Sequence, residues 1–124
     1  ELRVDRHWRS VRGGILADSV GFGKTACLIG LIQVGLQKPL EQVLSVPEME
    51  DLSKRFILSN ATLVITPPNL FEQWLGEFKK FLKPEQFEKC RIIEIPSIHR
   101  LNKLTVEDLA NADVVIVPYR FFFP

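Results

Sequence analysis

One short run of this sequence has the residue types, in the right order, for binding phosphate. Gly21 and Gly23 permit backbone angles that turn N–H groups inward, and the helical pattern that follows favours anions at its start. Lys24 supplies a long cation for the outer phosphates of a nucleotide, and Thr25 supplies a hydroxyl for magnesium. The run therefore predicts a nucleotide-binding loop. Its candidate residues are Asp18, Ser19, Val20, Gly21, Phe22, Gly23, Lys24 and Thr25.

The match to the general phosphate-loop motif, GxxxxGK[ST], is incomplete. That motif places a glycine where this chain has Asp18. A glycine-rich turn that happens to precede Lys24 and Thr25 is the alternative interpretation. The context favours nucleotide binding, because a continuously apolar run over residues 14–17 precedes the loop and a helical pattern over residues 24–36 follows it.

The elements that must position this loop follow an α/β pattern. Four short β-rich runs alternate with helical patterns, and three of them are continuously apolar, as in strands buried on both faces. This order predicts an α/β fold with a parallel β-sheet flanked by helices. The four runs are residues 14–17, 62–66, 91–95 and 114–117, of which the third is the one that is not continuously apolar.

Helical spacing of apolar residues marks the sides expected to face the core. The pattern over residues 69–82 is the clearest, and Asn69 and Glu72 are predicted to form a capping box at its start. A further helix is predicted to begin at Thr105, with Asp108 in the same capping position. The apolar positions are Phe71, Trp74, Leu75, Phe78 and Phe81 in residues 69–82, and Cys27, Leu28, Leu31, Ile32 and Gly35 in residues 24–36.

Composition excludes several classes of protein. The 124 residues are 46% hydrophobic and 25% charged, which is ordinary for one globular domain. A net charge of +1 excludes a polycation, so nucleic-acid contact must be local. Cys27 and Cys90 are too few for a disulfide scaffold and lack zinc spacing, which predicts reduced intracellular thiols and no metal besides magnesium. No apolar run reaches the length of a membrane span, so no membrane partner is expected.

Three motifs in order resemble those of the Swi/Snf-type helicase-like ATPases, the DNA translocases of superfamily two. Residues 13–25 resemble motif I, in which an aspartate occupies the position of Asp18. Residues 62–81 resemble motif Ia, with a strand, a proline loop and a Gln-Trp pair, and residues 113–119 resemble motif Ib. Ser19 and Phe22 replace the family's Glu and Leu, and neither replacement removes a phosphate ligand.

The resemblance implies cofactors, partners and further site residues. It implies ATP and Mg2+ at the loop, and DNA as a partner through the duplex backbone in chromatin remodelling or DNA repair. Thr66, Pro67, Asn69 and Tyr119 follow predicted strands at the edge where ligands bind in open α/β sheets, and they become candidate DNA backbone contacts. Plain turn chemistry is the alternative for these four residues. The implied location is nuclear in a eukaryote and cytoplasmic otherwise.

The resemblance also implies which part of the motor this sequence represents. The family's Asp-Glu box and second lobe have no counterpart in the sequence, so residues 1–124 are expected to be the N-terminal part of a partial RecA-like P-loop lobe. Residues 37–60 are expected to be an insertion or long loop. No catalytic residue is expected within the fragment, which alone should hydrolyse ATP negligibly. The alternatives are a complete small P-loop kinase or GTPase, and a non-catalytic interaction module with a vestigial loop.

Overall fold

Helices and strands alternate along the chain, as predicted for an α/β fold. The computed structural model describes residues 13–36, 57 and 59–122, so most of the expected insertion at residues 37–60 lies outside the described part. In chain order the elements are helix α1 (Lys24–Leu36), strand β1 (Thr62–Thr66), 3-10 helix η1 (Pro68–Leu70), helices α4 (Phe71–Phe81) and α5 (Pro84–Lys89), strand β2 (Ile92–Glu94), helices α6 (Ile98–Leu101) and α7 (Val106–Ala110), strand β3 (Val114–Pro118) and 3-10 helix η2 (Tyr119–Phe121).

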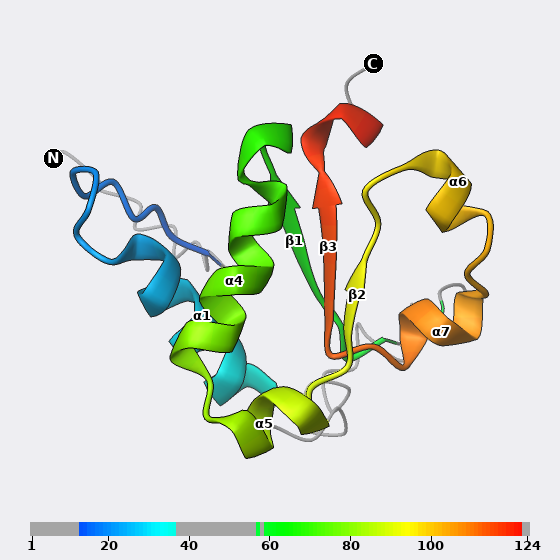
Figure 1. Cartoon of the computed structure of the whole chain (residues 1–124), viewed down its shortest axis with the longest axis horizontal. Coiled ribbons are helices and arrows are strands. Elements are labelled where there is room, and N and C mark those ends of the chain that lie inside the picture. The colour runs from blue at the N-terminus through cyan, green and yellow to red at the C-terminus, as the bar shows by residue number, and fades with distance from the viewer. Residues whose placement is uncertain (1–12, 37–56, 58, 123–124) are drawn as a thin grey trace, which may run out of the picture.

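The described strands form one parallel sheet in the order β1–β3–β2. Val114 of β3 is level with Thr62 of β1 and Ile92 of β2, so the strands predicted at residues 91–95 and 114–117 are confirmed with small shifts of their bounds. Because all three strands run the same way, their carboxyl ends meet at one edge, which we call the carboxyl edge (Figure 1). Every residue of β3 is buried, as its continuous apolar run predicts.

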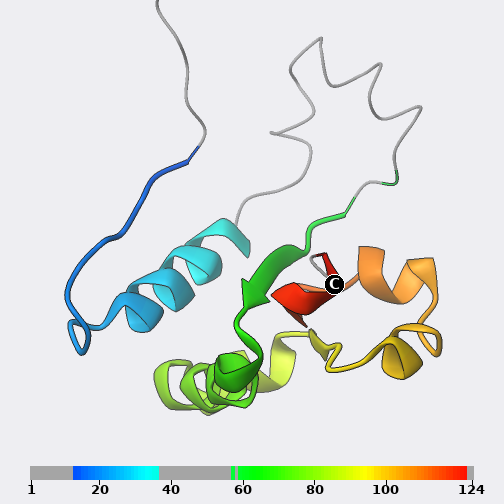
Figure 2. The ribbon, with the colours of Figure 1, turned by 90° about the horizontal axis from the view of Figure 1, so that it is seen from above.

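Helices lie on both faces of this sheet, α1 and α4 on one and α6 and α7 on the other (Figure 2). On the first face, Phe78 of α4 and Ile29 of α1 pack with Val64 and Ile116. The layered arrangement is typical of α/β folds, because each face of the sheet buries its apolar side chains against a helix. The core on the second face consists of Ile93, Ile95, Ala112, Val115 and Val117, with Leu101, Leu104 and Leu109 packed against it.

The prediction of a strand at residues 14–17 is wrong in this structure. The segment has no regular secondary structure, and the side chain of Ile15 is 96% exposed. A strand needs a neighbour that pairs its N–H and C=O groups, and the segment runs apart from the described sheet (Figure 2). The loop that precedes Lys24 is therefore attached to α1 and not to a paired strand.

The strand predicted at residues 62–66 is confirmed, but its burial on both faces is not. Val64 and Thr66 are buried, whereas the side chains of Leu63 and Ile65 are about half exposed. The reason is position in the sheet. β1 is an outer strand of the order β1–β3–β2, and its Leu63 and Ile65 point to the same face as α6 and α7. Those two helices lie at the β2 end of that face, so they leave the side chains of β1 partly uncovered (Figure 1).

The helix predicted over residues 69–82 is confirmed, but the capping box at its start is wrong. The α-helix begins at Phe71, after the 3-10 turn η1, and its N-cap residue is Leu70, without a side-chain cap bond. The Leu70 N–H donates to the Pro67 carbonyl over 3.0 Å. This turn shifts the start of the helix beyond Asn69, so Asn69 and Glu72 do not occupy the two capping positions.

Helix α1 has the predicted bounds, but it presents a different side to the core. Ile29 is buried against α4, whereas Cys27, Leu28 and Leu31 are exposed. The helix is apolar on nearly all sides, so helical spacing alone cannot decide which side is buried. None of the described helices has the length and apolar character to cross a membrane.

Candidate functional site

The ammonium group of Lys24 lies against the loop that precedes it. Lys24 Nζ donates hydrogen bonds of 2.7 Å to the carbonyl oxygens of Asp18 and of Ser19. These contacts fold the long side chain back over the turn instead of leaving it in solvent. A lysine ammonium has three N–H donors, so one donor beyond these two can serve an anion held by the loop.

Two glycines give the loop its shape. Gly21 has a φ of +91° and Gly23 has a φ of +77°, both in the left-handed region that other residues rarely adopt. A Cβ atom at either position would meet no atom within 4 Å, so the requirement for glycine comes from backbone angle and not from crowding. The Phe22 N–H donates to the Ser19 carbonyl over 3.5 Å and closes the turn.

The start of α1 completes a set of donors suited to phosphate. The helix begins at Lys24 directly after the turn, and no acidic residue occupies its first turn to oppose an anion. Thr25 is half-buried in that first turn, while Val20 and Phe22 are exposed on the loop. The lysine, the positive-φ turn and the helix start are therefore chemically suited to a nucleotide phosphate, with Thr25 as the hydroxyl available to magnesium.

The four candidate DNA contacts lie at the carboxyl edge, but they differ in exposure. Pro67 and Asn69 are exposed after β1, and Tyr119 is 45% exposed after β3. Thr66 is only 1% exposed, and its hydroxyl has no hydrogen-bond partner among the described residues. The Thr66 side chain is therefore not presented at the surface in this structure, and its role as a DNA contact stays a prediction.

A cavity at this edge includes a residue that the sequence reasoning missed. It has a volume of about 330 Å3, and Arg120 is the basic residue in its wall. The Arg120 Nη2 donates to the Pro96 carbonyl over 2.8 Å, which ties η2 to the loop after β2. The signal available in the sequence was a basic residue immediately after Tyr119. The remaining wall residues are Pro68, Asn69, Phe71, Glu72, Pro96 and Pro118.

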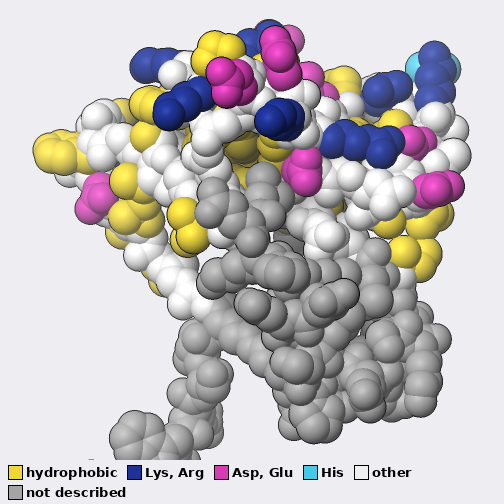
Figure 3. Space-filling model, turned by 90° about the horizontal axis from the view of Figure 1, so that it is seen from below, with side chains coloured by type: hydrophobic (Ala, Val, Ile, Leu, Met, Phe, Trp, Pro, Cys, Tyr) yellow, Lys and Arg dark blue, Asp and Glu magenta, His cyan; other side chains and the backbone are white. Residues whose placement is uncertain are grey.

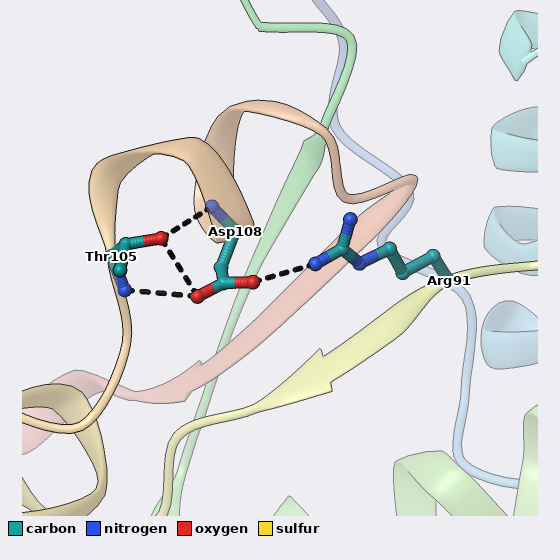
Figure 4. A network of polar contacts seen from close by, with 3 residues as sticks. All are labelled: Arg91, Thr105 and Asp108. Atoms are coloured by element: carbon teal, nitrogen blue, oxygen red, sulfur yellow. Dashed lines mark hydrogen bonds and ion pairs between the residues drawn. The ribbon is translucent and has the colours of Figure 1, made fainter.

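A polar network at the opposite end of the sheet is structural (Figure 4). The predicted capping box of α7 is confirmed, because Thr105 Oγ1 accepts from the Asp108 N–H over 3.1 Å and Asp108 Oδ2 accepts from the Thr105 N–H over 3.0 Å. Asp108 Oδ1 also pairs with Arg91 Nη2 at 2.7 Å. Hydrogen bonds from Thr105, and more weakly the Arg91 charge, lower the pKa of Asp108. Burial, and then the Asp113 charge, raise the pKa of Cys90.

Comparison with known proteins places this architecture in a family. The profile of the SNF2-related domain matches residues 2–122. The chain belongs to the SNF2-related domain family. This match covers nearly the whole chain and supports the Swi/Snf-type resemblance of the three motifs. It gives no support to a small kinase or GTPase, or to an interaction module with a vestigial loop.

Three curated relatives of this SNF2-related domain come from fungi. It is 32% identical over 112 residues, 90% of the chain, to a DNA (cytosine-5-)-methyltransferase DMT5 of Cryptococcus neoformans. It is 34% identical over 109 residues, 86% of the chain, to the DNA repair protein rad8 of Schizosaccharomyces pombe. It is 42% identical over 71 residues, 56% of the chain, to the DNA repair protein RAD5 of Debaryomyces hansenii. The chain spans only 4%, 9% and 6% of these relatives, respectively.

Within the described part of this SNF2-related domain, no cluster of three or more His, Cys, Asp or Glu side chains has the arrangement to hold a metal ion. Magnesium at the phosphate-binding loop would therefore depend on Thr25 together with the nucleotide, since a single hydroxyl is a weak cation site. The described residues build a loop whose donors are suited to an anion, with a second, partly basic cavity at the carboxyl edge.

Proposed function

We propose that this SNF2-related domain is the ATP-binding portion of a DNA-dependent ATPase that acts as a DNA translocase. The observation that carries the proposal is the Lys24 ammonium, held 2.7 Å from two loop carbonyls at the start of α1. The family match supports the same assignment. ATP bound with magnesium would supply the phosphoanhydride bond whose hydrolysis drives such motors.

Each loop residue has a distinct role in the proposed site. Gly21 and Gly23 keep the turn in its left-handed angles so that backbone N–H groups face the phosphates. Lys24 binds the outer phosphates, and Thr25 offers its hydroxyl to magnesium. The other loop positions, which contribute backbone groups or shape, are Asp18, Ser19, Val20 and Phe22.

The proposed DNA-binding surface is the carboxyl edge of the sheet. Pro67, Asn69 and Tyr119 are exposed there, and Arg120 adds a cation in the wall of the 330 Å3 cavity. Backbone contacts of this kind position a protein on duplex DNA without reading its sequence. The fungal relatives are two DNA repair proteins and a DNA methyltransferase, which supports DNA as the partner and the nucleus, with its chromatin, as the location.

We assign no catalytic residue to residues 1–124, which we propose are the N-terminal part of a RecA-like lobe with an insertion at residues 37–60. The groups that orient the attacking water and stabilise the transferred phosphoryl group are expected outside this sequence. Loss of such groups costs roughly a thousandfold or more in rate, so the 124 residues alone should hydrolyse ATP negligibly.

The deciding experiment measures magnesium-ATP binding by calorimetry on the protein that carries this domain. Lys24→Ala should weaken binding roughly 10- to 100-fold, because a charge-assisted hydrogen bond contributes about 1.5–3 kcal/mol. DNA-stimulated ATP hydrolysis should fall in parallel. Lys79→Ala, which removes an exposed lysine from α4, is the matched control and should change neither quantity. Equal ATP affinity in the Lys24→Ala and unmodified proteins would refute the proposed site.

A further inference from the structure

Two large apolar side chains project into solvent from the loop that precedes α1. The side chain of Val20 is 96% exposed and that of Phe22 is 74% exposed. Neither residue belongs to an apolar core cluster of the described chain. Figure 3 shows hydrophobic side chains at the left end of the molecule, where Figure 1 places this loop. Single exposed apolar residues are common, but two of them on one ligand-binding loop indicate a contact surface.

The turn separates the backbone of Phe22 from its ring. The Phe22 N–H donates to the Ser19 carbonyl over 3.5 Å, inside the turn, while the ring lies in solvent. Gly21 and Gly23 stand on either side with φ angles of +91° and +77°, and they set the course of the chain. The shape of the loop therefore depends on its glycines, and the ring stands at the rim of the proposed nucleotide site, two residues from Lys24.

The proposed reaction needs a body that covers this rim. Phosphoryl transfer depends on charged groups placed around the outer phosphates and on the exclusion of bulk water. Of the described loop residues, Lys24 offers one ammonium and Thr25 offers one hydroxyl. The groups that orient water and stabilise the transferred phosphoryl are proposed to lie outside residues 1–124. Whatever carries them has to approach the phosphates past the exposed Val20 and Phe22.

We propose that Val20 and Phe22 are positioning residues that bury their side chains against the catalytic part of the same protein when ATP and DNA are bound. The inference rests on the proposed function and deepens it, because it gives these side chains a role separate from phosphate binding. Burial of the Phe22 ring holds the closed arrangement and keeps water from the outer phosphates. The contact is reversible, since ATP enters and ADP leaves past the same rim.

The test compares ATP affinity with turnover in the protein that carries this domain. Phe22→Ser should lower the DNA-stimulated kcat roughly 10- to 100-fold, the loss expected when one large side chain no longer becomes buried. Without DNA, its Kd for magnesium-ATP should change less than about twofold, because the contact forms only after binding. Phe22→Leu should recover most of the kcat. Val106→Ser, which removes an exposed apolar side chain from α7, should change neither quantity.

A labelling experiment measures the burial directly. The Cys side chain of Phe22→Cys should react freely with a maleimide in the nucleotide-free protein. With a non-hydrolysable ATP analogue and duplex DNA present, the rate should fall roughly tenfold, because a closed state populated to about 90% leaves one tenth of the molecules accessible. Trypsin cleaves after Lys24, so peptide mass spectrometry separates label at position 22 from label at Cys27.

The outcomes distinguish this inference from the proposed function. An unchanged kcat in Phe22→Ser, or an unchanged labelling rate, would overturn the contact. A Tm that falls by several degrees in nucleotide-free Phe22→Ser would mean that the ring is packed permanently, which also overturns it. Loss of magnesium-ATP affinity as large as in Lys24→Ala would assign the ring to the nucleotide site instead. In these cases ATP binding by the unmodified protein leaves the proposed function standing, whereas absence of that binding removes both.

Discussion

At the scale of single residues, the phosphate-binding loop is shaped by backbone angle and by one side chain. Lys24 bonds to the carbonyls of Asp18 and Ser19, so its charge already lies over the turn. Gly21 and Gly23 supply left-handed angles that a residue with a Cβ adopts only with strain. The loop therefore depends on its glycines for conformation and on its lysine for charge.

Replacing Gly23 by alanine should weaken ATP binding without a steric clash. The φ of +77° imposes a strain of about 1–2 kcal/mol on a residue with a Cβ, while the space around that Cβ is open. We expect roughly 5- to 30-fold weaker magnesium-ATP binding by calorimetry. Gly30→Ala is the matched control, because Gly30 lies inside α1 with equally open space, and alanine there should raise stability by about 1 kcal/mol. Unchanged ATP affinity in Gly23→Ala would show that the left-handed angle is dispensable.

The Asp108 network should give stability a defined dependence on pH. Hydrogen bonds from Thr105, and then the Arg91 charge, lower the pKa of the Asp108 carboxyl below its ordinary value of 3.8. A lowered carboxyl pKa contributes stability that is complete above the ordinary value and is lost as the pH falls through the folded value. Asp108→Asn should therefore lower the Tm at pH 6. The difference in Tm between this variant and the unmodified chain should shrink below about pH 4.

Thermal unfolding between about pH 2.5 and pH 6 measures this dependence. Glu107→Gln removes the adjacent carboxylate of the same first turn, which forms no ion pair with a described residue, and it is the matched control for loss of a first-turn charge alone. If the Tm difference between Asp108→Asn and the unmodified chain stays constant with pH, ionisation of the Asp108 carboxyl is not the cause of that difference.

At the scale of elements, α1 and α4 show two ways in which a helix meets the core. α4 has separate apolar and polar sides, so its spacing correctly predicts the buried Phe71 and Phe78, with Trp74 packed against them. Phe81 is predicted on the same side, and that prediction is wrong, because the side chain at the end of the helix is 44% exposed. α1 is apolar nearly all round, and its buried side is decided by where α4 lies. A helix with one apolar stripe specifies its own orientation, whereas a helix without one depends on its neighbours.

Truncating Phe78 should therefore destabilise the chain far more than truncating its neighbour Phe81. Phe78 is 1% exposed within the core, and its loss leaves a cavity that costs about 3–5 kcal/mol. Phe81 is 44% exposed in the same helix, so Phe81→Ala should cost about 1 kcal/mol or less. Urea unfolding of the two variants measures both values, and similar losses would mean that α4 does not pack on the sheet through Phe78.

At the scale of the whole molecule, β3 is the centre on which the other elements depend. Both of its edges are paired and both of its faces are covered, whereas β1 keeps Leu63 and Ile65 about half exposed. The phosphate-binding loop lies outside this centre, attached through α1 (Figure 1). The ordered centre and the exposed loop are therefore expected to differ in local stability.

Hydrogen exchange should display that difference directly. Amides of β3 should exchange slowest, because their opening requires loss of the whole sheet. Amides of residues 14–17 should exchange within the fastest group, since they pair with no described strand. Peptide-resolved exchange measures both, and protection of residues 14–17 equal to that of β3 would indicate a paired strand there.

Local patterns in the sequence predicted much of this protein. The bounds of β1 and α1, the capping box of Thr105 and Asp108, and most of the apolar side of α4 follow from residues close together in the chain. These features depend on side-chain period and on caps. Such local patterns act within one or two turns of a helix or within one strand, so they can be recognised from the sequence alone.

Contacts between distant residues were decided only by the tertiary structure. Three features depend on which elements become neighbours. They are the pairing of residues 14–17, the buried side of α1, and the burial of Thr66 next to the exposed Asn69. The cavity that joins Arg120 to Asn69 depends on the same neighbours. A one-dimensional pattern records how apolar a segment is, but the partner that covers it is chosen by packing across the sheet.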